Sequence, residues 1–182
     1  SDNEDNIWVW KENKLYILPK GTSKPDVLSI DKDERFWAVS PYGKLLSAMS
    51  QKSLYTISSD RKRIKKVASL PEGYTMRDHL FMSSDNTMWV WSTGKLWKLV
   101  NGKWVMTLQL ASDVTGMAED KDHRIWVSSQ SDGIYICNLQ GDVQTHLRHT
   151  PDDVHGLKSN MIEAIKYEPE SQTIWIAYTK GG

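Results

Sequence analysis

The sequence lacks several features that would assign it to a common class of protein. Cys137 is the one cysteine among 182 residues, so the chain can form no internal disulfide. No run of about 18 apolar residues occurs, which excludes a transmembrane helix in this chain, and no apolar signal segment opens it. The 23 basic residues balance the 23 acidic ones. This balance argues against a general nucleic-acid or membrane-binding surface.

Motifs for catalysis and metal binding are also missing. No Gly-x-Ser-x-Gly elbow, His-Glu-x-x-His motif or glycine-rich phosphate loop occurs. His146 and His149 have a spacing that suits a metal on a helix, but their segment is predicted to be strand and then loop. Asp120 and Asp122 lie in a predicted turn, where Asp caps backbone N–H groups. We therefore predict no catalytic residue, no metal and no cofactor.

Tryptophan is abundant, with nine residues, and it marks a repeated pattern. A polar turn leads into a short apolar run centred on Trp, and a second polar turn leads into another apolar run. Each such pair predicts a β-hairpin. The copies are Asn6–Lys11 with Lys14–Leu18, Thr87–Ser92 with Lys95–Leu99, Arg124–Ser128 with Gly133–Ile136, and an opening half at Gln172–Ala177.

The aromatic residue of the following strand sets the length of the repeat. Tyr16, Tyr55, Trp97 and Tyr135 are 39, 42 and 38 residues apart. On this ruler Phe36–Ser40 is the first strand of its unit, although it imitates a Trp hairpin strand. A unit of four short antiparallel strands repeated about every 40 residues is typical of a β-propeller blade.

The predicted fold class is therefore all-β, a partial β-propeller of four-stranded antiparallel blades in a single domain, residues 1–182. Seventeen strands are expected. The predicted blades are approximately residues 6–31, 35–70, 76–109 and 113–147, with a truncated one at 161–182. A β-sandwich is the rival, but it would not explain a Trp at the same point of successive units. The chain begins and ends inside a unit, so we expect an open arc of a longer protein whose end blades are covered by another copy or by neighbouring chains.

The last two units resemble the two-component regulator propeller repeat family. Gly156–Ile165 is similar to its opening, GL-x-SN-x-I-x-x-I, and Ile174–Ile176 with Gly181 and Gly182 is similar to its continuation, IWIGT…GG. Ala177 and Tyr178 stand where the family usually has Gly-Thr. Glu119–Val127 is similar to the segment ED-x-x-G-x-IWV, with His123 in place of Gly.

The resemblance implies a role. Such repeats form the extracytoplasmic, periplasmic sensor of membrane-anchored hybrid two-component histidine kinases, many of which respond to oligosaccharides. This chain carries no kinase motif, so the resemblance implies a non-enzymatic sensor or binding segment of a kinase parent. Two alternatives stay open, a propeller enzyme of the lyase type and a protein-interaction scaffold.

The ligand is expected on one face of the blades. Loops after the second and fourth strands of an up-and-down blade emerge on the same face, and binding residues concentrate on loops held by a rigid scaffold. The longest such loop, 148–160, supplies cations suited to an acidic group, and neighbouring aromatics could stack on sugar rings. The candidate ligand-binding residues are Tyr74, Arg77, Arg148, His149, His155, Lys158 and Tyr178.

The expected partners are a small glycan or oligosaccharide and, by self-association or receptor dimerisation, another copy of the chain. No nucleic acid is expected. The dense basic run Arg61–Lys66 leads into a fourth, outermost strand. It either protects that edge strand by charge or binds a sulfated or uronic glycan.

Overall fold

The computed structural model of the protein describes residues 4–40, 46–75 and 80–179. Within these ranges every regular element is a β-strand, and seventeen strands form five antiparallel sheets. This described part contains no helix suited to crossing a membrane. The chain divides into two compact units, Ser1–Leu80 with Asn101–Lys103 and Phe81–Val100 with Trp104–Gly182. Each unit is taken by itself below.

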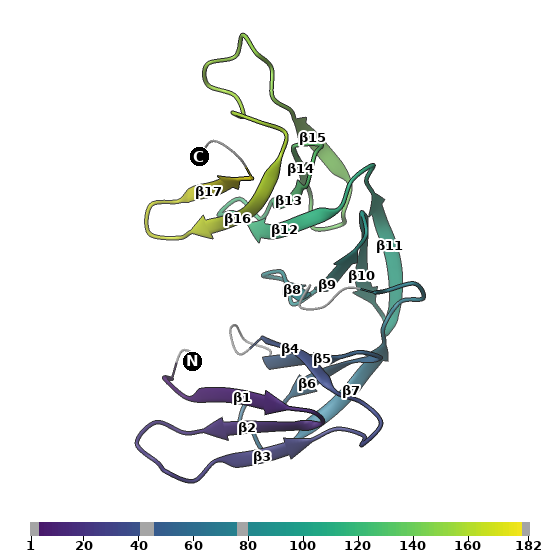
Figure 1. Ribbon diagram of the computed structural model, residues 1–182, viewed down its shortest axis with the longest axis vertical. Coiled ribbons are helices and arrows are strands. Elements are labelled where there is room, and N and C mark those ends of the chain that lie inside the picture. Colours follow the sequence, from purple (N-terminus) through teal and green to yellow (C-terminus); the bar gives the residue numbers. More distant parts are fainter. Residues whose placement is uncertain (1–3, 41–45, 76–79, 180–182) are drawn as a thin grey trace. The chain divides into compact units, whose positions relative to one another are not determined.

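The first unit holds two sheets, drawn in purple and blue in Figure 1. Sheet A has the order β1 (Ile7–Lys11), β2 (Lys14–Leu18), β3 (Asp26–Ser29). Sheet B has the order β4 (Phe36–Ser40), β5 (Leu46–Ser50), β6 (Ser53–Ile57), β7 (Ile64–Ser69). Each strand pairs with the next one along the chain, as expected of an up-and-down blade.

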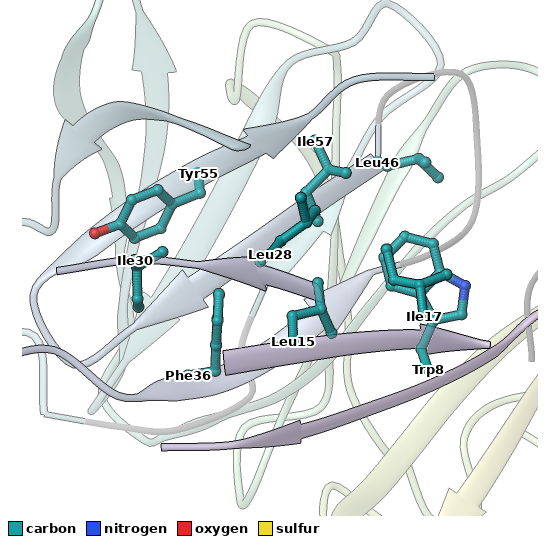
Figure 2. Close-up of a cluster of buried hydrophobic side chains, with 10 residues drawn as sticks. Trp8, Leu15, Ile17, Leu28, Ile30, Phe36, Leu46, Tyr55 and Ile57 are labelled. Atoms are coloured by element: carbon teal, nitrogen blue, oxygen red, sulfur yellow. The ribbon is translucent and has the colours of Figure 1, made fainter. Parts of the chain in front are cut away.

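The core of this unit lies between the two sheets, and Figure 2 shows its side chains meeting there. Strand β2 explains how it forms, because residues two apart point to the same side of a sheet. Leu15 and Ile17 are fully buried, while Lys14 on the other side is exposed. Phe36 meets Tyr55 edge to face, with ring centroids 6.4 Å apart. The apolar residues that alternate along the strand thus lie on one side of the sheet and form one apolar layer.

The second unit holds three sheets. Sheet C comprises β8 (Leu80–Met82), β9 (Met88–Ser92), β10 (Lys95–Val100) and β11 (Lys103–Gln109). Sheet D comprises β12 (Val114–Glu119), β13 (Ile125–Ser129), β14 (Ile134–Cys137) and β15 (Val143–Leu147). Sheet E comprises β16 (Ile162–Glu168) and β17 (Thr173–Tyr178).

Apolar layers also hold the second unit together. Trp89, Leu96, Ile125 and Val127 belong to one cluster of buried side chains from sheets C and D, and all four are fully buried. A smaller cluster joins sheet D to sheet E through Ile134, Leu157 and Ile162, with Trp126 and Tyr178 among the half-buried side chains around it. Strands with apolar side chains on both faces therefore lie between neighbouring sheets.

A left-handed residue recurs before the Trp strands. Asp5, Asn86, His123 and Gln172 have φ of 61°, 65°, 59° and 54°, and each lies three residues before a Trp. A positive φ is uncommon outside Gly and is most frequent at Asn, Asp and His. The family resemblance expects Gly at His123, and the backbone there keeps the conformation that favours Gly.

The strands follow the sequence prediction closely. β4 is the first strand of sheet B, which confirms the aromatic ruler over the Trp-strand interpretation of that segment. The sequence predicts the next strand over Lys44–Ala48, and β5 ends at Ser50, two residues beyond that. The predicted starts of the strands at Lys44 and Met76 fall outside the described residues, as do Gly181 and Gly182.

Candidate ligand-binding cavity between sheet D and strand β17

A cavity of about 580 Å³ lies between sheet D and strand β17. The loop 148–160 and the β12–β13 turn supply its polar lining, which includes Arg124, Arg148 and His155. Trp126, Tyr178, Leu157, Ile174 and Ile176 supply its apolar lining. Ligand pockets have volumes of about 300–1,000 Å³ and combine apolar walls with a few placed polar groups. The cavity is therefore of a size and composition that suit a small ligand.

Two aromatic side chains in this cavity are held in fixed orientations. The indole Nε1 of Trp126 donates to Oδ2 of Asp120 at 2.8 Å. The hydroxyl of Tyr178 accepts a hydrogen bond from the backbone N–H of Lys158 at 3.2 Å, and its own proton stays available to another acceptor. Aromatic rings bind the apolar faces of sugars while their polar ends stay hydrated.

Asp120 organises the turn below Trp126. Its Oδ1 accepts the backbone N–H groups of Asp122 and Arg124, each at 3.0 Å, and its Oδ2 accepts Nε of Arg124 at 2.7 Å. Burial raises the pKa of Asp120, but the hydrogen bonds from Trp126 and Arg124 outweigh it and hold the pKa below its usual value. The carboxylate is therefore a structural anchor that is already satisfied by protein donors.

A second anchored acid, Asp132, lies beneath Arg148. Its Oδ1 is 2.9 Å from Nη2 of Arg148, and its Oδ2 accepts the hydroxyl of Tyr135. Burial and the Asp132 carboxylate raise the pKa of Tyr135 to about 12, so this hydroxyl stays a donor. Arg148 keeps a side chain that is 59% exposed, which leaves donors of its guanidinium for a ligand.

The loop 148–160 is fastened to sheet D by specific hydrogen bonds. The backbone N–H of Gly133 donates to the carbonyl of Asn160 at 3.0 Å, and Oδ1 of Asn160 accepts the backbone N–H of His149 at 2.7 Å. The ring Nδ1 of His149 lies 2.6 Å from the carbonyl of Leu157, so Nδ1 carries the proton and donates. These contacts position one wall of the cavity.

The predicted site residues are only partly brought together. Arg148, His155 and Tyr178 line the cavity. His149 and Lys158 belong to the same loop, but His149 bonds to Leu157 and Nζ of Lys158 bonds to the carbonyl of Val154 at 3.3 Å. Tyr74 lies in the other unit, and Arg77 lies outside the described residues. The seven residues thus remain a prediction, of which three share one cavity.

Several lining residues were not predicted from the sequence. Trp126, Arg124 and Gln172 come from the ends of strands opposite to the predicted face. The repeat itself offered no signal for them: Trp126 is only half-buried whereas its counterpart Trp89 is fully buried. That difference depends on which strands cover each Trp, and it could not be read from the Trp motif alone.

The possible metal ligands and the basic run have protein partners. The ring of His146 stacks on Tyr135 with centroids 3.8 Å apart, and its Nε2 lies 2.7 Å from the carbonyl of Asp132. No group of three or more His, Cys, Asp or Glu that could hold a metal occurs in the described part of the chain. In the basic run, Nη2 of Arg61 pairs with Glu4 at 2.9 Å, and Lys66 lies 3.9 Å from buried Glu34.

No family model matches this sequence, and no curated protein matches it. Solved structures share its fold. Two extracellular domains from B. thetaiotaomicron proteins described as hybrid two component systems superpose with TM-scores of 0.68 and 0.67, at 15% and 16% identity. Each match covers 97% of this chain and 25% or 24% of the other. The chain therefore spans about a quarter of the length of these domains.

A third similar structure is an enzyme. Virginiamycin B lyase from Staphylococcus aureus superposes with a TM-score of 0.70 at 13% identity, and the match covers 97% of this chain and 60% of the lyase. At such identities the likeness concerns the fold alone. The described part of the protein is thus all-β, with three four-stranded antiparallel sheets among its five and propeller-like structural neighbours.

Proposed function

We propose that this chain is a non-enzymatic, ligand-sensing segment of a β-propeller in a two-component system sensor, and that it binds an oligosaccharide. Its parent would be a hybrid histidine kinase with this segment on the extracytoplasmic side of the membrane. The blade pattern in the sequence and the likeness to two extracellular sensor domains support the proposal. The single observation that carries the ligand class is the cavity between sheet D and β17.

The chemistry of that cavity suits a sugar with an acidic group. Trp126 and Tyr178 offer aromatic surface, and Arg148 and His155 offer donors for a carboxylate or sulfate. Of the carboxylates that line the cavity, Asp120 and Asp122 are paired with Arg124, and Asp153 accepts the backbone N–H of His155 at 3.0 Å. A stacking surface beside a guanidinium fork recognises both the ring and the charge of an acidic sugar.

The proposal is tested in two stages. First, a panel of neutral, uronic and sulfated oligosaccharides is titrated into the isotopically labelled chain, and the indole N–H resonance of Trp126 is followed by NMR. Arg148→Ala should weaken binding of an acidic oligosaccharide about tenfold, the loss expected for one charge-assisted contact. Lys95→Ala, on strand β10 away from the cavity, is the matched control.

Second, Arg77, Arg148 and Lys158 are replaced singly by Ala in the full-length receptor, and glycan binding and transcriptional response are measured. Reduced response in at least the Arg148 variant supports the proposal. If all three respond like the parent while changes at the opposite ends of the strands abolish the signal, the predicted face is wrong. If no member of the glycan panel moves the Trp126 resonance, the oligosaccharide assignment fails.

A lyase is the second candidate, favoured by the likeness to virginiamycin B lyase and by one histidine–carboxylate pair. Nδ1 of His123 lies 2.8 Å from Oε1 of Glu119, as a general base and its orienting acid would. Incubating the chain with virginiamycin B, with and without a divalent cation, decides the matter by mass spectrometry. Conversion that is lost in His123→Asn would establish the enzyme, and an unchanged substrate would exclude this activity.

A further inference from the structure

A second cavity, of about 510 Å³, lies where the β8–β9 and β12–β13 turns meet the end of β16. Phe81, Met117, Ile165 and Tyr167 form its apolar wall. Its polar lining includes Ser84, Glu119, Lys121 and His123. None of the predicted ligand-binding residues that the structure describes lines it.

A carboxylate–imidazole pair fixes one lining group. The Glu119 side chain is 11% exposed, and its carboxylate accepts the backbone N–H of Ser84 at 2.6 Å and the Ser84 hydroxyl. It also lies 2.8 Å from Nδ1 of His123. Because a carboxylate can only accept, the proton of the neutral imidazole sits on Nδ1. The Nε2 atom is then an acceptor, and no described residue donates a hydrogen bond to it.

Some charged side chains that line this cavity have protein partners and one does not. Glu119 is occupied by Ser84 and His123, and Asp120 is paired with Arg124 at 2.7 Å. Lys121 is exposed on the same turn as His123 and forms no ion pair within 4.0 Å with any described carboxylate. An ammonium group without an ion-pair partner among the described residues therefore lines the same cavity as an imidazole with an open acceptor and an apolar wall.

The neighbouring turn provides the internal contrast. The β8–β9 turn places Ser84 at the position of Lys121 and Asn86 at the position of His123, with the same left-handed backbone, φ 65° against 59°. The β8–β9 turn therefore folds without a cation or an imidazole. The two side chains that equip the second cavity are thus not needed to form the turn.

We propose that this cavity is a separate binding site for a small organic anion that carries both a carboxylate and hydroxyl groups, a hydroxycarboxylate. A ligand hydroxyl donates to Nε2 of His123, and the ligand carboxylate lies against the ammonium of Lys121. The carbon skeleton covers the apolar wall formed by Met117, Ile165 and Tyr167. Lys121 lines both cavities, whereas His123 lines only this one, so His123 distinguishes the proposed site from the oligosaccharide site.

The test is an NMR titration of the labelled chain with D-gluconate, using sorbitol and propionate as probes that keep only the hydroxyls or only the carboxylate. The backbone amide of Ser84 and the imidazole Nε2 of His123 report on the site. Gluconate should shift both resonances in a saturable manner, with an affinity about tenfold above that of sorbitol or propionate. Each matched variant, His123→Asn and Lys121→Ser, should lower gluconate affinity about fivefold.

The controls separate a loss of this site from misfolding. His123→Asn and Lys121→Ser copy residues that the β8–β9 turn already uses, so an unchanged amide spectrum elsewhere shows that the fold is kept. Lys95→Ala should bind gluconate like the parent. Equal binding of gluconate by the His123→Asn variant, equal affinity for all three probes, or no shift at Ser84 and His123 would each overturn the proposal.

Discussion

Sheets C and D form the same five-residue turn between their first two strands with different side chains. In sheet C the N–H of Asn86 donates to the carbonyl of Ser83 at 2.9 Å, and in sheet D the N–H of His123 donates to that of Asp120 at 3.1 Å. Both turns lead three residues later into a Trp. The backbone is therefore shared, and only the side chains that stabilise it differ.

The two turns satisfy the same donors by different routes. In sheet C, Ser83 accepts the indole of Trp89 at 3.0 Å, and Asp85 accepts the Ser83 hydroxyl at 2.6 Å and the N–H of Thr87 at 3.0 Å. In sheet D, Asp120 alone accepts the indole of Trp126 and the N–H of Arg124. The turn thus accommodates a carboxylate at its first or its third position, as long as the Trp indole and the backbone N–H of the fifth residue each have an acceptor.

In both sheets the turn between the second and third strands contains a glycine. Replacing this glycine should lower the free energy of unfolding more than any other change considered. A Cβ on Gly133, where φ is +75°, would lie 2.2 Å from the carbonyl oxygen of Leu147. On Gly94 it would lie 2.9 Å from the carbonyl oxygens of Leu110 and Ser112. Gly133→Ala should cost about 3 kcal/mol or more in free energy of unfolding, and Gly94→Ala about 2 kcal/mol.

Urea unfolding measures both glycine variants. Gly102→Ala is the control, since it has φ +76° and no atom within 4 Å of the added Cβ; it should cost about 1 kcal/mol from backbone strain alone. Gly133→Ala should also disturb the loop 148–160, because Gly133 donates to Asn160. Equal losses in free energy of unfolding at all three positions would show that the structure relieves the clash of the added Cβ, and that only the backbone strain at positive φ destabilises the variants.

Removing the acid of the sheet D turn should have the next largest effect. Asp120→Ala leaves the indole of Trp126 and the N–H of Arg124 without their acceptor, at a cost of about 2–3 kcal/mol. The matched control is Asp122→Ala, whose carboxylate is 55% exposed and reaches only Arg124, at 3.2 Å; it should cost less than about 0.5 kcal/mol. An Asp122 variant as unstable as the Asp120 variant would contradict the assignment of the anchor.

Much of this arrangement was predictable from sequence, and the reasons for the rest are physical. Strand positions follow from short-range alternation and turn residues, so the aromatic ruler placed even Phe36–Ser40 correctly. The cavity depends on contacts distant in sequence. Arg148 reaches Asp132, and Tyr178 reaches Lys158, and neither pairing leaves a periodic signal. Trp126 occupies the same motif position as buried Trp89, so the motif does not distinguish the two, whereas the exposure of Trp126 depends on its contacts with sheet E.

The neutral counterpart in sheet C should cost less. Ser83→Ala removes the acceptor of the Trp89 indole and one donor to Asp85, for a loss of about 1–2 kcal/mol. The Trp89 indole donates to an uncharged hydroxyl, whereas the Trp126 indole donates to the charged carboxylate of Asp120. Hydrogen bonds to charged groups are about twice as strong. Urea unfolding of Ser83→Ala beside Asp120→Ala measures the ratio. A larger loss at Ser83 would show that burial of Trp89 outweighs the charge on Asp120.

Lowering the pH should reduce the stability that the carboxylates of both turns contribute. Burial raises the pKa of Asp85 and of Asp120, but hydrogen bonds to each carboxylate hold its pKa below the usual 3.8. A depressed folded-state pKa adds stability that is fully present above the unfolded pKa and is lost as pH falls through the folded one. Unfolding free energy measured from about pH 5 downward should therefore fall, and less steeply in Asp120→Asn. Buried Glu34 in the first unit shifts the same way, so part of the slope should persist.

The smallest effect is expected where the two turns are made alike. His123→Asn gives the sheet D turn the residue that sheet C uses at Asn86, with φ 65° there and 59° at His123. Asn tolerates the left-handed region at least as well as His. The variant loses the contact of Nδ1 with Glu119, but the imidazole is 63% exposed, so the free energy of unfolding should change by less than about 0.5 kcal/mol. His123→Val is the contrasting variant, since a β-branched residue at positive φ should cost about 1–2 kcal/mol. If Asn and Val were equally costly, the imidazole–carboxylate contact rather than the backbone conformation would govern this turn.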